Sequence, residues 1–154
     1  MQNIQNIPFA DISVGLQRQY SKTLTERDLA LFAETSGDYN PVHLDSTYAA
    51  STAFGERIAH GMWSGALISA AIATTLPGPG SVYRSQTLKF SKPVKLGDTI
   101  TITLTVIDKK DRVKLVTLAC EGQNQRGETV VKGEAEVIAS ADSLSFTVGA
   151  TAGA

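Results

Sequence analysis

The chain has 154 residues, of which 42% are hydrophobic and 19% are charged, so it is long enough for one domain with a core and too short for two. Its 14 basic and 15 acidic residues leave a net charge of -1, with no basic stripe interleaved with aromatic residues. We therefore expect a single domain over 1–154 that does not bind nucleic acid. The one cysteine, Cys120, excludes an internal disulfide and a cysteine-rich metal site.

Nothing in the sequence indicates secretion or a membrane span. The segment from Met1 to Asp11 lacks the basic start and apolar stretch of a secretion signal. The apolar run from Met62 to Leu76 is shorter than the ~20 residues that a bilayer needs, and serines and threonines interrupt it. We therefore expect no membrane association and a cytoplasmic setting, in which Cys120 is a small core residue.

The first expected elements are a strand over 15–24 and a helix that begins after Thr25. Thr25 and Asp28 have the spacing of a helix-capping arrangement, apolar residues then recur on one face, and Gly37 is placed to end the helix.

The segment 37–44 is expected to be irregular. Pro41 disfavours helical geometry at Asn40, so the preceding helix cannot continue through it. Asp45 or Ser46 then has the character of a cap for a short helix.

A second loop, 54–60, leads into the long apolar helix over Met62–Leu76, which the Pro-Gly-Pro-Gly run at 77–80 terminates. This helix is apolar on every side, which is typical of a helix that is surrounded by other elements. Its many glycines and alanines allow a close approach by a sheet.

The remaining segments are typical of strands. Thr99 to Val106 alternates strictly between threonine and aliphatic residues, which indicates a strand with one buried face. The expected strands are 82–90, 99–106, 113–120 and 131–137. Residues 140–154 are small and weakly patterned, and we expect them to form a disordered tail.

Together these elements predict an α+β chain in which one antiparallel sheet curls around the long apolar helix. Such a sheet leaves an edge strand, and edges are commonly covered by pairing with a second copy of the chain. The expected assembly is therefore a homodimer.

The candidate chemistry centres on the only two histidines, His43 and His60, which lie in loops just before helices. Asp38 and His43 flank a rigid Asn40-Pro41 turn that can aim both side chains the same way. His60 precedes the apolar helix, where unpaired backbone N–H groups concentrate positive partial charge. Each residue also has an ordinary structural interpretation, as a turn former or a hydrogen-bonded histidine.

Other kinds of site are poorly supported. One aspartate and two separated histidines lack a characteristic metal-ligand spacing, so no metal is expected. The run from Gly61 to Gly65 contains Ser64 but not at the spacing of a nucleophile elbow. There is no phosphate-binding or dinucleotide glycine motif, so a nucleotide or NAD cofactor is not indicated.

Two strings carry a family resemblance: Ser-Gly-Asp-Tyr-Asn-Pro-Val-His-Leu-Asp over 36–45, and Ile-Ala-His-Gly-Met over 58–62. Together they closely resemble the MaoC-like (R)-specific enoyl-CoA hydratases, in particular the small bacterial enzymes linked to polyhydroxyalkanoate synthesis. The resemblance extends over roughly 7–138, including the turn from Phe90 to Asp98.

The resemblance implies a hot-dog fold, a homodimer with enoyl-CoA bound near the subunit interface, and no cofactor. It makes Asp38 and His43 the catalytic pair and the Gly61 backbone N–H the donor to the thioester carbonyl. The expected substrate-binding residues are Asn40, His60, Ser69 and Ile72. The implied reaction converts a trans-2-enoyl-CoA to the (R)-3-hydroxyacyl-CoA, linking fatty-acid β-oxidation to polyhydroxyalkanoate monomers.

Several alternatives stay open at this point. A hot-dog acyl-CoA thioesterase or an acyl-carrier-protein dehydratase would use the same fold, and a non-catalytic acyl-CoA-binding protein is the alternative of a different class. The sequence leaves open the acyl chain length, whether Asp38 or His43 is the water base, and which basic residues meet the CoA phosphates.

Overall fold

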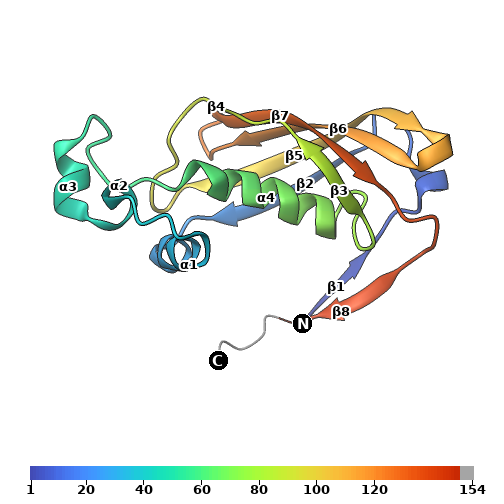
Figure 1. The fold of residues 1–154 in the computed structure, drawn as a ribbon, viewed down its shortest axis with the longest axis horizontal. Coiled ribbons are helices and arrows are strands. Elements are labelled where there is room, and N and C mark those ends of the chain that lie inside the picture. The colour runs from blue at the N-terminus through green and yellow to red at the C-terminus, as the bar shows by residue number, and fades with distance from the viewer. Residues whose placement is uncertain (150–154) are drawn as a thin grey trace.

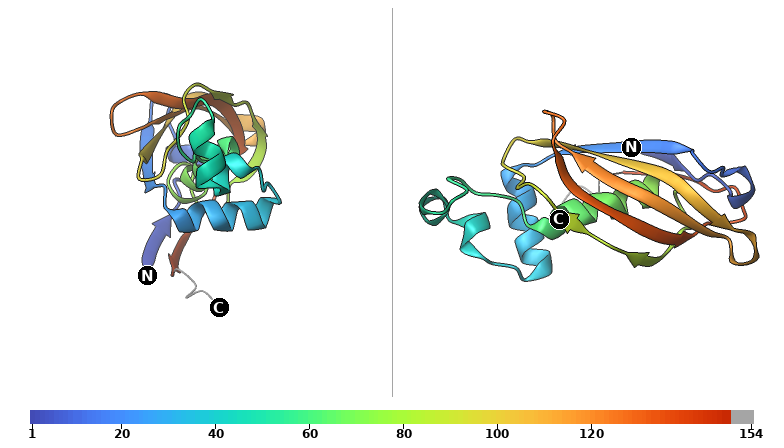
Figure 2. Two further views of the ribbon diagram at one scale, coloured as in Figure 1. Left: turned by 90° about the vertical axis from the view of Figure 1, so that its left-hand side faces the viewer. Right: turned by 90° about the horizontal axis from the view of Figure 1, so that it is seen from above.

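Helix α4 (Gly61–Thr74) is the element around which the other elements are arranged in the computed structural model, which describes residues 1–149. An antiparallel sheet curls over one side of α4, and three shorter helices gather near its first turn (Figures 1 and 2). The other helices are α1 (Glu26–Ser36), α2 (Pro41–Leu44) and α3 (Ser46–Ser51), with short 3-10 turns η1 (Phe9–Asp11) and η2 (Asp111–Val113).

The main sheet has six strands in the order β2-β5-β6-β7-β3, with β4 also paired to β7. All its pairings are antiparallel. The strands are β2 (Gln17–Thr23), β3 (Val82–Gln86), β4 (Lys89–Phe90), β5 (Thr99–Lys110), β6 (Leu115–Gln123) and β7 (Thr129–Ile138). The predicted α+β architecture, an antiparallel sheet around a long helix, is confirmed.

The alternation predicted for β5 is confirmed. Its aliphatic side chains, from Ile100 to Val106, are buried against the core, while its threonines lie on the outer face. There they bond to side chains of β2, as in the pair of hydroxyls of Ser21 and Thr101 at 2.7 Å. Because successive strand residues point to opposite faces, this pattern fixes the register of β2 on β5.

Helix α1 begins and ends where the sequence predicts. The Thr25 hydroxyl accepts a hydrogen bond from the Asp28 N–H, and the Asp28 carboxylate accepts one from the Thr25 N–H. Gly37 ends the helix with φ 77°, a left-handed conformation that glycine adopts without strain.

The segment 37–44 differs from the irregular conformation predicted for it. Pro41 does stop α1 from continuing, but it also stands at the first position of a new helical turn, α2. Proline is well suited there because its fixed φ is helical and no N–H is needed. Asn40 caps α2 by accepting from the Val42 N–H at 3.2 Å.

Helix α4 is buried on one side only. Trp63, Leu67, Ile68, Ala71 and Ile72 pack into the core. The opposite side carries an exposed stripe at helical spacing, which consists of Met62, Ala66, Ser69 and Ala73. Met62 is 56% exposed there, so one chain covers the apolar helix less completely than its sequence predicts.

The strand predicted over 82–90 is divided in two. Residues 87–88 separate β3 from β4, and both strands pair with β7. Two hydrogen bonds fix the main chain at this break. The Thr87 N–H donates to the Glu134 carbonyl, and the Thr87 hydroxyl accepts from the Glu134 N–H. Gly133 permits this, because a Cβ there would stand 1.8 Å from the Thr87 carbonyl oxygen.

The two ends of the chain pair with each other. β1 (Gln2–Gln5) and β8 (Ser145–Val148) form a separate two-stranded sheet, whereas a disordered tail is predicted over 140–154. The buried Asn6 joins the segment after β1 to the segment before β8, because its side chain donates to the Asp142 carbonyl and accepts from the Leu144 N–H. The rest of that tail, 150–154, lies outside the described residues. Among the described helices, none has the length and apolar character needed to cross a membrane.

Gly133→Ala tests the close approach of the β3–β4 break to β7. We expect it to lower the free energy of unfolding by about 2 kcal/mol or more, since an added methyl group must displace the Thr87 main chain. Urea denaturation measures this. Gly149→Ala is the matched control, because its Cβ would meet only Met1 Cγ at 3.7 Å. Equal stability of the two variants would contradict the prediction.

Candidate functional site

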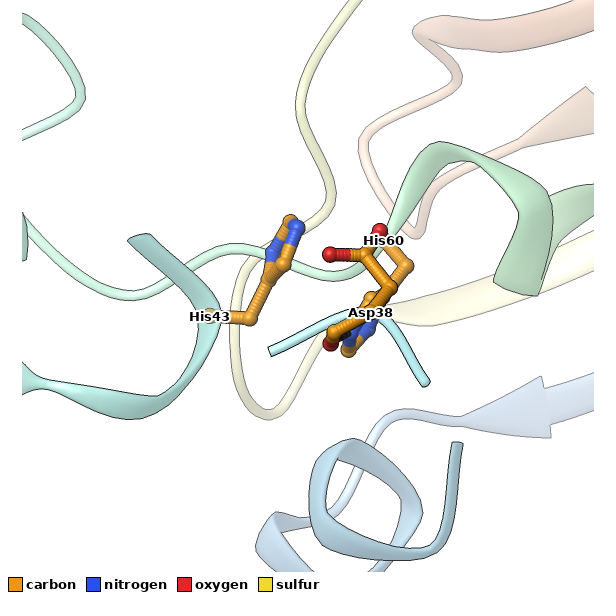
Figure 3. A group of neighbouring side chains, drawn as sticks. All are labelled: Asp38, His43 and His60. Carbon is orange, nitrogen blue, oxygen red and sulfur yellow. Dashed lines mark hydrogen bonds between the residues drawn. The ribbon is translucent and has the colours of Figure 1, made fainter. Parts of the chain in front are cut away.

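Asp38, His43 and His60 come together where the loop between α1 and α2 meets the first turn of α4 (Figure 3). Each contributes a polar side-chain atom, and these atoms lie within 4.8 Å of one another. His43 and His60 are buried and Asp38 is exposed. The sequence predicted that Asp38 and His43 point to the same place, and the structure brings them together.

Helix α2 holds His43 with one ring nitrogen engaged. Nδ1 lies 2.8 Å from the carbonyl oxygen of Ile58, which can only accept, so Nδ1 carries the proton. In the neutral ring Nε2 is therefore left with a lone pair. An imidazole in this tautomer can accept a proton at Nε2.

The loop fixes Asp38 through its own backbone. One carboxylate oxygen accepts from the Asn40 N–H at 3.1 Å, and the Asp38 N–H donates to the Ser36 hydroxyl at 3.1 Å. These local turns leave the second carboxylate oxygen free of any described protein partner. The position of the carboxylate thus depends on the path of the main chain.

The environment lowers the pKa of His43 below its ordinary value of 6.5. Burial is the largest cause, because it disfavours the charged imidazolium. The hydrogen bond to Ile58 raises the pKa, His60 lowers it, and the nearby Asp38 carboxylate raises it. Since the lowering effects prevail, His43 is a neutral base at neutral pH.

The first turn of α4 lacks the side-chain cap found on the other α-helices. Thr25, Asn40 and Asp45 cap α1, α2 and α3, whereas the N-cap residue of α4, His60, makes no such bond. Backbone N–H groups in an uncapped first turn are available to an anionic or carbonyl oxygen. The Gly61 N–H is among them.

A cavity of about 390 Å³ opens beside this turn. His43, His60, Gly61 and Ser64 line one side of it, and Phe54 and Phe90 contribute aromatic surface. The two phenylalanines have no signal in the sequence, because nothing in their spacing indicates that the loop before α4 and strand β4 converge here. An apolar cavity with a few convergent polar groups is the usual form of a small-molecule site.

The cluster has residue types that can bind a metal ion, but its geometry does not favour one. The rings of His43 and His60 are stacked, with centroids 3.8 Å apart and planes inclined by 26°. Nearly parallel rings direct their lone pairs side by side rather than toward one point, which suits a metal ion poorly. The expectation that no metal is bound stays a prediction.

The other predicted site residues do not belong to the cluster of Asp38, His43 and His60. Asn40 lies on the same loop, and its side-chain oxygen is engaged in capping α2. Ser69 lies further along α4 and lines a separate cavity of about 540 Å³ between α4 and β3. Ile72 is buried in the core and is 2% exposed. Their substrate-binding roles, like the catalytic roles of Asp38 and His43, stay predictions.

The candidate contacts for the CoA phosphates are Arg84, Lys89, Lys92 and Lys95, and the structure does not gather them at one place. Lys92 lines the cavity beside Gly61 and forms an ion pair with Glu128. Arg84 lines the cavity between α4 and β3. Lys95 lies 3.8 Å from Glu56 across an exposed pair.

Comparison with known proteins agrees with this geometry. The family described as MaoC like domain matches residues 8–125. An (R)-specific enoyl-CoA hydratase of Rhodospirillum rubrum is 45% identical over 130 residues, which cover 84% of this chain and 90% of that protein.

Two solved structures extend the similarity. The unliganded R-hydratase PhaJ1 from Pseudomonas aeruginosa superposes with a TM-score of 0.95 at 52% identity, covering 99% of this chain and 98% of that one. The (R)-hydratase from A. caviae involved in PHA biosynthesis has a TM-score of 0.79 at 39% identity, covering 82% of this chain and 96% of that one. The predicted hot-dog fold and family resemblance are confirmed.

Titration of His43 by NMR tests the electrostatics of the site. We expect a pKa below 6.5, and a lower value still in Asp38→Asn, because that change removes a carboxylate that favours the imidazolium. The exposed Asp108→Asn is the matched control and should leave the pKa unchanged. A rise of the pKa in Asp38→Asn would contradict this account.

Proposed function

Because the chain belongs to the MaoC-like domain family, we propose that it is an (R)-specific enoyl-CoA hydratase, which adds water to a trans-2-enoyl-CoA and forms the (R)-3-hydroxyacyl-CoA. One observation carries the proposal: a neutral histidine and a carboxylate lie together beside an uncapped helix start and an apolar cavity. The (R)-3-hydroxyacyl-CoA is the kind of product that supplies polyhydroxyalkanoate synthesis, and one similar hydratase is described as involved in PHA biosynthesis.

The first step of the proposed reaction is the attack of water on the β-carbon. His43 Nε2, which has a free lone pair, takes a proton from the water as its oxygen bonds to the β-carbon. The electron pair of the double bond moves toward the thioester oxygen. Asp38 lies close enough to orient the water and to stabilise the imidazolium that forms.

The second step returns a proton to the α-carbon. The His43 imidazolium passes its proton to the nearby Asp38 carboxylate. The electron pair moves back from the thioester oxygen, and the α-carbon takes this proton from Asp38 on the same face, which restores the neutral His43 and the Asp38 carboxylate. The roles of Asp38 and His43 are exchangeable in this scheme, and the net change is the addition of one water.

In this proposal the uncapped first turn of α4 stabilises the negative charge of the transition state. Negative charge develops on the thioester oxygen, and the Gly61 N–H is the proposed donor to it. The loss of one such donor typically costs ~3 kcal/mol in activation free energy. General acid–base assistance contributes roughly 10²–10⁴-fold.

We further propose that the active enzyme is a homodimer formed across β3 and α4. The exposed stripe of Met62, Ala66, Ser69 and Ala73 lies beside β3, which is an edge strand of the sheet. The cavity of about 540 Å³ lies between the same two elements and contains Ser69. A second copy placed here would cover the edge and the apolar stripe, and would enclose the cavity for an acyl chain.

We also propose that the enzyme acts in the cytoplasm. Its one cysteine is buried, and burial raises the pKa of the Cys120 thiol to about 11. A reducing compartment suits a chain with this cysteine usage.

Hydration of trans-2-enoyl-CoA by the purified protein tests the function. We expect loss of the enoyl thioester absorbance, no release of free thiol, and an R product by chiral analysis. Free thiol would indicate a thioesterase, and an S product would overturn the family assignment of stereochemistry. Faster turnover of acyl-carrier-protein thioesters would favour a dehydratase.

Variants of the pair test the assignment of residues. Asp38→Asn and His43→Ala should each lower kcat by 10²-fold or more, since each removes a proton-transferring group. Asp108→Asn again serves as the control. Near-normal turnover in either variant, measured on folded protein, would exclude that residue from the chemistry.

Sedimentation tests the dimer. We expect a species of twice the 16.3 kDa chain mass. Val82→Lys, at the exposed edge of the sheet, should shift it toward the monomer by placing charge in the interface. Val14→Lys, an exposed valine outside β3, is the matched control. A wild-type protein that sediments as a monomer would contradict the proposal.

A further inference from the structure

His60 combines three features that its expected role in substrate binding does not explain. It is 2% exposed, it stands at the N-cap of α4 without capping it, and its Nδ1 is a buried atom with no hydrogen-bond partner among the described residues. Buried polar groups are nearly always paired, so an unpaired one in a site calls for a functional account.

We propose that His60 is a positioning residue, which fixes Asp38 and His43 relative to each other and to the start of α4 by a hydrogen bond to one and a stacked contact with the other. This inference rests on the proposed hydratase function of the site.

The hydrogen bond acts on Asp38 through its main chain. Nε2 of His60 lies 2.9 Å from the Asp38 carbonyl oxygen, so Nε2 carries the proton and donates it. The Asp38 side chain is exposed and is held by a bond within its own loop. The bond from His60 is therefore the described side-chain contact that ties this loop to α4, where the Gly61 N–H lies.

The stacked contact acts on His43. The two imidazole rings lie 3.8 Å apart, and the ring of Phe32 in α1 packs against His60 with centroids 5.0 Å apart. His60 thus stands between α1 and α2 and presents a flat face to the His43 ring. Together with the bond from His43 to Ile58, this contact restricts rotation of the catalytic ring.

These two contacts require a histidine. A phenylalanine would keep the ring and lose the donor, and a glutamine would keep a donor at a similar reach and lose the ring. A neutral histidine provides both the donor and the flat ring. Because its proton is on Nε2, the unpaired Nδ1 carries a lone pair and not a buried N–H without an acceptor.

The charged and titratable groups that face His43 are Asp38, from the loop after α1, and His60, from the start of α4. Asp38 favours the imidazolium and His60 disfavours it. A proton on His60 would repel the His43 imidazolium, so removal of the His60 ring raises the pKa of His43. Since the base acts in its neutral form, the acidic limb of the rate profile moves to higher pH.

Kinetics of His60→Phe and His60→Gln test the proposal. We expect His60→Phe to lower kcat by between about 10- and 100-fold, with KM within about threefold, because misplaced groups lose rate rather than binding. His60→Gln should recover part of this loss and shift the acidic limb upward. Trp63→Phe, a change in the same buried turn outside the site cavity, controls for stability and should alter Tm without altering the profile.

Two kinetic results would overturn the proposal. One is a wild-type kcat and pH profile in His60→Phe. The other is a raised KM with unchanged kcat, which would make His60 a substrate-binding residue.

NMR of the imidazole nitrogens provides a test that does not depend on activity. The chain has two histidines, so His60→Gln leaves His43 as the only signal. The wild type should show His60 protonated at Nε2 and His43 at Nδ1, and the pKa of His43 should rise in His60→Gln. Opposite tautomers or an unchanged pKa would exclude the proposal, even if His60→Phe fails to fold. A wild type that shows this NMR pattern but hydrates no enoyl-CoA would refute the function alone.

Discussion

The packing of one side of α4 against the curled sheet is the constraint on which the site depends. Ile68 and Ala71 are fully buried in the core, so the helix axis is fixed by close packing. That packing places the uncapped first turn at one end of the sheet, where the loops from α1 and α3 converge (Figure 1). The packing of α4 thereby holds the main chain of Gly61 in place, although glycine has no side chain that could anchor it.

Much of the fold could be predicted because its signals are local. The threonine alternation of β5, the capping box of α1 and the glycine at its end each follow from residues close in sequence. The break between β3 and β4 could not, because it depends on Thr87 meeting Gly133 across the sheet. The β1–β8 pair is equally non-local, since it joins the two ends of the chain.

The residues of the site also divide into those with a local sequence signal and those placed only by tertiary packing. The rigid Asn40-Pro41 turn indicates that Asp38 and His43 can share a direction, and the structure places them together. The stacking of His43 on His60 has no sequence signal, because it depends on how α2 and α4 meet in space. The convergence of Phe54, from the loop after α3, and Phe90, from β4, has no sequence signal for the same reason. Local turn chemistry thus predicts that Asp38 and His43 lie together, and only tertiary packing reveals their surroundings.

The pairing of β1 with β8 places the first and last described strands side by side at the far end of α4. Gln2 is aligned with Val148, and the segment that follows β1 bonds to Pro77, just beyond the helix. The 14-residue helix then separates this ribbon from its first turn by about 20 Å. A protein fused ahead of β1 would therefore begin at this ribbon and not at the cavity beside the first turn of α4.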